Sequence, residues 1–244
     1  MRTPLISIII PTLNEEKGLK KALENLTSGL HDTNYELIIS DGGSNDKTVS
    51  IAKKYADKIF VHKEKRRQTI GEGRNEGAKI ARGKYIAFVD ADVTIPDQDK
   101  FFKKTVEEFD SRPGLVALTA NIRVLPDRES WADWLVYLWL NSFHKIMNNL
   151  FHQGRAAGEF QMHVRKEFLK IGGFSETFAA GEDYELFIRC SRNGYTLLAP
   201  LTVYHTGRRA RKTGWPRLLI KWFLNSLSAS FSHKSVSKEW EVIR

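Results

Sequence analysis

The sequence is poor in cysteine and in long apolar runs. Its 244 residues include one cysteine, Cys190, which excludes an internal disulfide and fits a reducing compartment. No segment approaches the roughly 20 consecutive apolar residues of a membrane-spanning helix. The first apolar run, residues 5–10, is too short for a signal-peptide core, and no small-residue cleavage site follows it. We therefore expect a cytoplasmic protein, either soluble or peripheral on the cytoplasmic face of the membrane.

Acidic residues are missing from one long stretch near the C-terminus. Between Leu201 and Lys238 there are eight lysines and arginines and no aspartate or glutamate. The net charge of +9 therefore belongs mostly to this tract. Such a tract suits phosphates or anionic lipid headgroups, or it is a solvated face that aids solubility. A nucleic-acid binder would leave the acidic clusters described below unexplained, so we expect no nucleic-acid partner.

The first half of the chain alternates between strand and helix patterns. Strands are expected at residues 5–10, 35–40, 58–62 and 84–89, and helices at residues 15–30, 47–55 and 72–81. Asn45 or Asp46 can cap the second helix, and Gly83 is expected to end the third. The alternation predicts right-handed βαβ units and an α/β fold with a mostly parallel central sheet flanked by helices.

The second half is less regular. Helices are expected at residues 98–110, 129–150, 166–171, 184–192 and 215–231, and strands at residues 115–124, 160–164 and 195–204, the last broken at Pro200. No repeat or long linker interrupts the pattern. We expect one domain over residues 1–210, with a nucleotide-binding half (1–95) and an acceptor-binding half (96–210), followed by a basic amphipathic segment over 211–244.

Ligands of open parallel sheets bind beyond the carboxyl ends of the strands. At these ends the sequence places polar and acidic residues: Pro11, Thr12, Asn14 and Glu15 after the first strand, Asp41 and Gly43 after the second, and Asp90, Ala91 and Asp92 after the fourth. The Asp41 carboxylate can accept a hydrogen bond from a uracil or guanine imino group or from a ribose hydroxyl. The alternative is a turn, with Ser44 or Asp46 capping the next helix.

Asp90 and Asp92 follow an expected buried strand. Two carboxylates so close at a buried strand end repel each other, and a divalent cation relieves this repulsion and can bridge to diphosphate oxygens. Oxygen ligands favour Mg²⁺ or Mn²⁺. His205, at the end of a later strand, can complete the metal shell or can be an ordinary buried histidine.

Further charged residues stand where a donor and an acceptor would meet. Arg74 and Asn75 are expected to face the donor from the start of a helix. Glu182 and Asp183 open another helix, where the dipole favours them in any case, and Asp183 can also act as a general base. Arg208 and Arg209 can neutralise a leaving diphosphate.

Together these pieces resemble the family 2 glycosyltransferases of the GT-A, Rossmann-like fold. The matching segments are residues 7–15, 41–46, 73–77, 88–92 and 181–183. The resemblance implies that Pro11, Thr12, Asn14, Glu15 and Asp41 line the nucleoside pocket. It implies that Asp90 contacts ribose or metal, that Asp92 ligates the metal and that Asp183 is the base of an inverting displacement. Gly73 departs from the family pattern, and the tract after His205 is the least family-like part.

The implied function is metal-dependent transfer of a sugar from a UDP- or GDP-sugar to a carbohydrate or polyprenyl-linked acceptor. A sugar-nucleotide nucleotidyltransferase and a non-catalytic binding module are the alternatives. The apolar helix that includes residues 131–140 is either core or a contact for a membrane or lipid acceptor, since it carries three tryptophans. The segment 215–224 combines bulky apolar and basic residues, as interfacial helices do.

Overall fold

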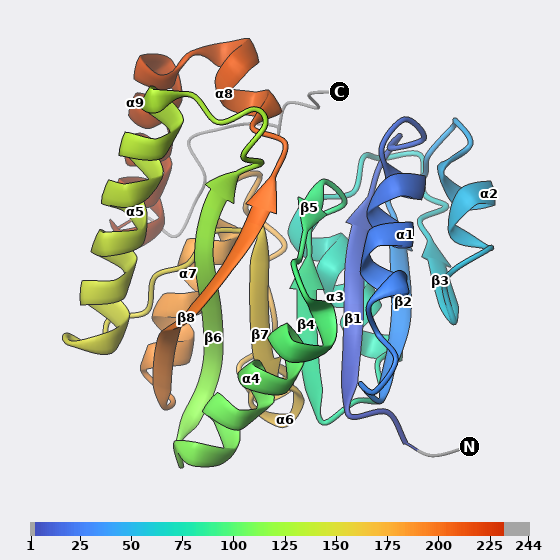
Figure 1. Ribbon diagram of the computed structural model, residues 1–244, viewed down its shortest axis with the longest axis horizontal. Helices are drawn as coiled ribbons and strands as arrows, with labels where there is room; N and C mark the ends of the chain where they lie inside the picture. The colour runs from blue at the N-terminus through green and yellow to red at the C-terminus, as the bar shows by residue number, and fades with distance from the viewer. Residues whose placement is uncertain (1–2, 232–244) are drawn as a thin grey trace.

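A single eight-stranded sheet runs through the molecule, with strand order β3-β2-β1-β4-β7-β6-β8-β5 (Figure 1). The structure is a computed structural model and describes residues 3–231. The strands are β1 (Ile6–Thr12), β2 (Tyr35–Asp41), β3 (Lys58–Val61), β4 (Tyr85–Val89), β5 (Val93–Thr94), β6 (Leu115–Val124), β7 (Phe160–Val164) and β8 (Tyr195–His205). Strands β3, β2, β1 and β4 are parallel neighbours, as are β6 and β8, whereas β7 and β5 are antiparallel to the strands they pair with.

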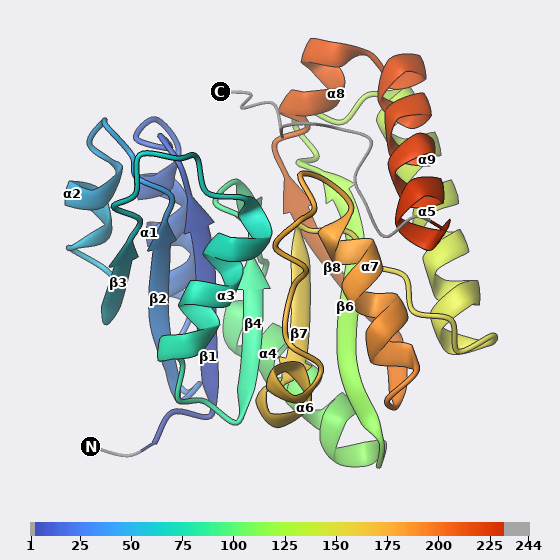
Figure 2. The same ribbon diagram turned by 180° about the vertical axis from the view of Figure 1, so that it is seen from behind.

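Helices cover both faces of the sheet. They are α1 (Leu19–Ser28), α2 (Thr48–Ala52), α3 (Ile70–Ile80), α4 (Gln98–Ser111), α5 (Trp131–Asn149), α6 (Arg165–Lys170), α7 (Glu182–Ser191), α8 (Arg208–Thr213) and α9 (Trp215–Phe231). Helices α1, α4 and α5 pack on one face, and α3, α6 and α7 on the other (Figures 1 and 2). The expected α/β domain with a mostly parallel sheet between helices is confirmed.

Strand β1 is apolar on both sides because each of its faces meets a different helix layer. Ile8 and Ile10 join the core under α1 and α4, while Ile9 joins the core under α3. At the second contact Gly77 of α3 is needed, since a Cβ there would lie 2.4 Å from Ile9 Cγ2. This close packing sets the height of α3 over the sheet, and α3 carries Arg74.

Three expectations about local structure need correction. Helix α1 begins at Leu19, because residues before it bond to the segment that follows β2: the Asn14 amide donates to Ser44 Oγ, and the Glu15 amide donates to Thr48 Oγ1 at the start of α2. Gly83 does not cap a helix: α3 ends at Ile80, and Gly83 instead allows a close approach, since a Cβ there would lie 2.6 Å from the Ser7 nitrogen.

Pro200 does not break β8, which is one strand from Tyr195 to His205. The ladder to β6 shifts register between Thr119 and Asn121, opposite residues 199–201 of β8. A bulge of this kind accommodates a proline because no ladder hydrogen bond is required of it.

The C-terminal tract packs onto the domain as far as the structure describes it. The expected boundary after residue 210 falls inside α8, and beyond it Leu218 and Asn225 are buried. The Trp215 Nε1 donates to Asp133 Oδ1 over 2.8 Å. Of the expected segment, residues 232–244 lie outside the described residues. No helix within residues 3–231 has the length and apolar character needed to cross a bilayer.

Candidate active site

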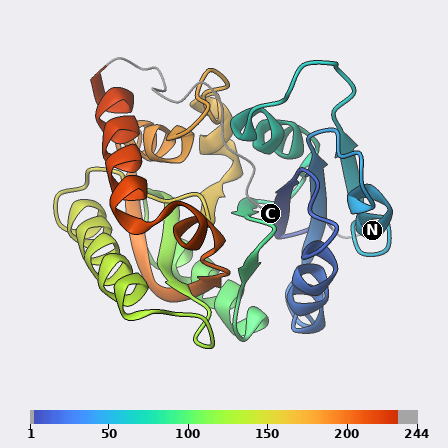
Figure 3. The same ribbon diagram turned by 90° about the horizontal axis from the view of Figure 1, so that it is seen from above.

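The carboxyl ends of β1, β2 and β4 meet at one edge of the sheet, which Figure 3 views from above. At the end of β2, Asp41 is fully buried and organises the turn that follows. Its Oδ1 accepts the amides of Gly43 and Ser44, and its Oδ2 accepts the hydroxyls of Thr12 (2.9 Å) and Ser44 (2.6 Å). The turn alternative is therefore present, and contact of Asp41 with a base stays a prediction that requires the Ser44 hydroxyl to move.

The loop after β1 is locked to the same turn. Asn14 has a φ of 54°, a left-handed conformation that asparagine tolerates better than most residues. Its amide donates to Ser44 Oγ over 2.7 Å, and its side-chain oxygen accepts the Asn45 amide over 2.9 Å. Gly43 has a φ of 91°, and a Cβ there would lie 3.3 Å from the His62 carbonyl oxygen. The two loops thus form one preorganised rim.

A buried arginine joins the carboxylates of Asp90 and Glu182. Arg74 of α3 is 1% exposed. Its Nη2 donates to Asp90 Oδ1 and to the Gly158 carbonyl, and its Nη1 donates to Glu182 Oε1, each over 2.9 Å. Its Cζ lies 5.1 Å from the centre of the Phe174 ring. Arg74 therefore faces the candidate site, as expected, but as a bridge between two protein carboxylates.

Asp183 lies next to this bridge, in the first turn of α7. A Cβ on Gly158 would lie 3.4 Å from Asp183 Oδ2 and 2.9 Å from Arg74 Nη2, so the glycine lets the backbone pass close to both side chains. Burial raises the pKa of Asp183, and Arg74 opposes the shift. Burial and the Asp183 charge raise the pKa of Glu182 to about 7. A carboxylate whose pKa is moved towards neutrality suits proton abstraction.

The repulsion between Asp90 and Asp92 is offset by two arginines. Asp90 pairs with Arg74, while Asp92 Oδ2 lies 3.2 Å from Arg208 Nε and accepts the Thr206 hydroxyl over 2.7 Å. The same Arg208 binds both oxygens of Glu15 over 3.0 Å each. The repulsion argument alone therefore does not require a divalent cation.

His205 is brought to Asp92 by a strand pair that the sequence did not reveal. Val93 of β5 pairs with His205 of β8, and Asp92 directly precedes β5. His205 is 8% exposed, and its Nε2 is buried without a hydrogen-bond partner among residues 3–231. Burial lowers the pKa of His205, which keeps the ring in the neutral form that binds metals. An unpartnered, buried ring nitrogen beside a carboxylate fits a metal ligand.

The expected three-residue metal set is not preformed. Within residues 3–231 no three histidine, cysteine, aspartate or glutamate side chains gather closely enough to hold an ion. Asp90 instead accepts a hydrogen bond from Arg74. Asp92 and His205 remain the pair that fits, and Mg²⁺ in particular is often held by one or two carboxylates together with substrate phosphates.

The other expected site residues lie around this cluster. The Asn75 amide bonds to Phe174 and Glu176, so the structure gives it a role in holding that loop, and its donor contact stays a prediction. Ala91, which separates the two aspartates in the sequence, is buried, and Pro11 is the last residue but one of strand β1. Arg209 follows Arg208 on α8, and its charge lowers the raised pKa of Tyr137.

Two residues of the cluster were missed. The Glu159 carbonyl accepts the Asp90 amide over 3.1 Å, and burial with the charges of Asp90, Asp183 and Asp92 raises the Glu159 pKa to about 8. Tyr137 of α5 packs edge-on against His205, with ring centres 5.2 Å apart. Glu159 comes directly before β7, and only the antiparallel pairing of β7 with β4 brings it to this edge.

Comparison with known proteins shows the family of the chain. Residues 7–179, well over half of the chain, match the family described as glycosyl transferase family 2. The chain belongs to this family. The family assignment favours a glycosyltransferase over a nucleotidyltransferase or a non-catalytic module.

Two relatives of this glycosyltransferase family 2 chain have similar sequences over most of its length. An uncharacterized glycosyltransferase of Methanocaldococcus jannaschii is 29% identical over 209 residues, which are 80% of this chain and 67% of the relative. A dolichyl N-acetyl-alpha-D-glucosaminyl phosphate 3-beta-D-2,3-diacetamido-2,3-dideoxy-beta-D-glucuronosyltransferase of Methanococcus voltae is 30% identical over 210 residues, 79% of this chain and 63% of the relative. The chain thus spans about two thirds of the length of these relatives.

Solved structures confirm the GT-A fold. A mannosyltransferase from Pyrobaculum calidifontis, in complex with GDP-Man and Mn²⁺, matches 95% of this chain and 65% of that chain with a TM-score of 0.71 at 16% identity. The glucosyl-3-phosphoglycerate synthase of Mycobacterium tuberculosis, in complex with Mn²⁺, UDP and glucosyl-3-phosphoglycerate, matches 94% of this chain and 79% of that chain with a TM-score of 0.64 at 20% identity.

Proposed function

We propose that this chain transfers a sugar from a nucleotide-diphosphate sugar to an acceptor hydroxyl or phosphate, with Asp183 as the general base. The observation that carries the proposal is the Arg74 bridge, whose two 2.9 Å ion pairs join Asp90 at the end of β4 to Glu182 at the start of α7. The bridge sets the candidate base beside the edge where a nucleotide would lie. A UDP- or GDP-sugar is the donor class we propose, as in the complexes of the structural neighbours.

The proposed reaction is a single inverting displacement. Asp183 takes the proton of the acceptor as the acceptor oxygen attacks the anomeric carbon, and the bond from that carbon to the diphosphate breaks. The raised pKa of Asp183 makes it a better proton acceptor than an exposed carboxylate. Arg208, already beside Asp92, would stabilise the charge of the leaving diphosphate.

A divalent cation, Mn²⁺ or Mg²⁺, belongs to the proposal. Asp92 and His205 would hold it, and when bound it would neutralise diphosphate charge. The free Nε2 of His205 supports this assignment. On the donor side, Asp41, Thr12, Asn14 and Glu15 would line the nucleoside pocket, and a carbohydrate or polyprenyl-linked acceptor and a place on the cytoplasmic face of a membrane complete the proposal.

The test is a screen of UDP- and GDP-sugars by thermal unfolding and by donor hydrolysis, each with Mn²⁺, with Mg²⁺ and with a chelator. A donor present at 100 times its Kd should stabilise the fold by about 2.7 kcal/mol. We expect this for one nucleotide class and only with metal, and we expect Asp92→Asn to lose it. Asp127→Asn, a change on an exposed side chain, is the matched control. If no nucleotide sugar stabilises the chain under any metal condition, the proposal is wrong.

A further inference from the structure

Helix α5 has mostly polar side chains on its buried side and large apolar side chains on its exposed side, the reverse of an ordinary surface helix. Its buried positions are Asp133, Tyr137, His144 and Asn148, of which three are polar or charged and the fourth carries a hydroxyl. Its exposed positions carry large apolar side chains, each 36% to 74% exposed: Trp131, Trp134, Leu135, Leu138, Trp139, Phe143 and Ile146. These residues recur every three or four positions and therefore form one stripe along the helix. Of the two alternatives that the sequence left open for this helix, a place in the core does not hold for most of its apolar side chains.

The orientation of the apolar stripe is fixed by hydrogen bonds on the opposite side of α5. Two of the inward polar groups are hydrogen-bonded: Asp133 accepts from Ser130 and Trp215, and Asn148 bonds to the Arg155 backbone. Asn141 bonds to both the amide and the carbonyl of Ile122 in β6. These contacts fix the polar side of α5 against the sheet, so the apolar side can only face outwards.

Helix α9 extends the apolar area. It lies beside α5 at the same end of the molecule in all three views (Figures 1, 2 and 3). The Trp215 ring packs edge-on against Tyr137 of α5, with centres 5.5 Å apart. Ile220, Phe223 and Leu224 are 44% to 64% exposed. We call the exposed apolar side chains of α5 and α9 together the α5–α9 surface. Many exposed large apolar side chains on two neighbouring helices are typical of an interaction site.

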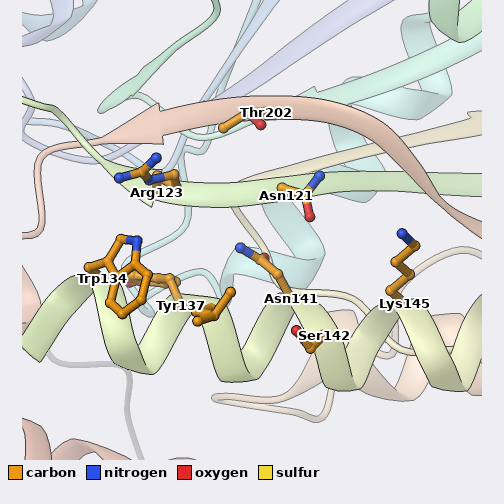
Figure 4. A pocket seen from close by; sticks show the side chains of 9 residues that line it. Asn121, Arg123, Trp134, Tyr137, Asn141, Ser142, Lys145 and Thr202 are labelled. Atoms are coloured by element: carbon orange, nitrogen blue, oxygen red, sulfur yellow. The ribbon is translucent and has the colours of Figure 1, made fainter.

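The charged side chains on α9, and on α5 after Asp133, are all basic. After Asp133, α5 contains no acidic residue, and the sequence of α9 contains none. Lys145 on α5 and Arg217 on α9 are exposed. Figure 4 shows Lys145 on the same helix as Trp134, beside a groove of about 310 Å³ between α5 and strands β6 and β8. The surface therefore combines tryptophans, aliphatic side chains and cations, and within the described residues of the two helices no acidic residue follows Asp133.

We propose that the α5–α9 surface docks on an anionic lipid bilayer. Tryptophan and neighbouring cations are the residues that favour the membrane–water interface, and a bilayer supplies both the apolar layer and the negative charge. A second copy of this chain fits poorly, because a two-fold contact through this surface would bring its uncompensated cations close to one another. The docking does not depend on the chemistry proposed for the sugar transfer.

Vesicle binding tests the docking directly. The full chain is sedimented with phosphatidylcholine vesicles that contain or lack phosphatidylserine. We expect binding to the anionic vesicles, weakened by salt. The double variant Trp139→Ser and Ile220→Ser changes two side chains that are each 61% exposed, and it should weaken vesicle binding at least about ten-fold. Replacing Lys145→Gln together with Arg217→Gln should weaken it roughly twenty-fold or more, at about five-fold for each cation. Leu169→Ser on α6, an exposed leucine away from this surface, is the matched control.

The controls separate docking from folding and from catalysis. Donor hydrolysis in solution should be unchanged in the docking variants, since neither pair touches the candidate active site. If the Trp139→Ser and Ile220→Ser variant fails to fold, the Lys145→Gln and Arg217→Gln variant, whose side chains lie outside the core, tests the docking alone. No binding to anionic vesicles, or equal binding by the wild type and the cation pair, overturns the docking. So does a dimer that Trp139→Ser and Ile220→Ser dissolve while vesicle binding persists, because the surface would then be a subunit interface.

Discussion

Arg74 lies between Asp90 and Glu182, with its Nη2 2.9 Å from Asp90 Oδ1 and its Nη1 2.9 Å from Glu182 Oε1. Helix α3 thereby supplies a cation for strand β4 and for helix α7, which are far apart in the sequence. Replacing one partner of a buried ion pair leaves an uncompensated charge, which typically costs 3–5 kcal/mol.

Arg74→Gln should therefore lower the free energy of unfolding by about 3–5 kcal/mol at neutral pH. The Arg74 charge opposes the rise in the pKa of both carboxylates, so without it they take up protons more readily. Protonation removes the unpaired charge, and the deficit should shrink at mildly acidic pH. Urea unfolding at both pH values measures this. Arg82→Gln, at a mostly exposed arginine, should show a small effect, and an equal loss in both variants would contradict the bridge.

Asp183→Asn should abolish sugar transfer and leave donor binding nearly intact. The base contributes typically 10²–10⁴-fold to the rate, and its carboxylate is not among the groups proposed for the nucleoside or the metal. Transfer rates and donor affinity from thermal shifts are compared with those of Asp127→Asn, an exposed position. A variant that loses donor affinity as severely as transfer would move Asp183 into the donor site and out of the base role.

Local sequence patterns predicted most of the fold. The bounds of β6, β7 and α9 agree with the expected residues 115–124, 160–164 and 215–231, because each has a clear apolar pattern. Strand β5 has two residues and is defined by its pairing with β8, so no local sequence pattern predicts it. Helix α8 has six residues between Gly207 and Gly214, which is too short for a period to be visible.

The sequence predicted the candidate site residues that stand directly after strands. It did not predict those that reach the site through pairing between distant segments. Asp41, Asp90 and Asp92 stand directly after expected strands. Glu159 comes before a strand, and its place beside Asp90 depends on an antiparallel partner. The bonds of Arg208 to Glu15 and Asp92 join residues more than 100 positions apart, which no spacing argument reaches.

Acid stability should depend on His144. Burial lowers its pKa in the folded chain from 6.5 to about 4. A histidine with a lowered folded pKa contributes stability that is present above 6.5 and is lost as the pH falls through about 4, because the unfolded chain binds the proton more tightly. This part amounts to at most about 3 kcal/mol. His144→Gln should flatten the acid side of the stability curve, measured by urea unfolding across this range. His31→Gln, at an exposed histidine, should leave the slope as in the wild type, and a slope unchanged by His144→Gln would contradict the assignment.

Arg208 already occupies the carboxylate that we propose for the metal. In the free chain its Nε lies 3.2 Å from Asp92 Oδ2, and its two other nitrogens hold Glu15. An ion that binds Asp92 and His205 would compete with this contact, since both cations would interact with the same carboxylate. A charge-assisted hydrogen bond is worth about 1.5–3 kcal/mol, which is roughly ten-fold or more in affinity.

Arg208→Ala should therefore bind Mn²⁺ alone more tightly than the wild type, by up to that factor, in a titration that follows free Mn²⁺ by electron paramagnetic resonance. The same variant should bind the complete donor more weakly, because the diphosphate loses a cation. Arg128→Ala, at an exposed arginine paired only with Asp127 among the described ion pairs, should change neither affinity. If Arg208→Ala weakened Mn²⁺ binding in the absence of nucleotide, Arg208 would be supporting the metal site and not competing for it.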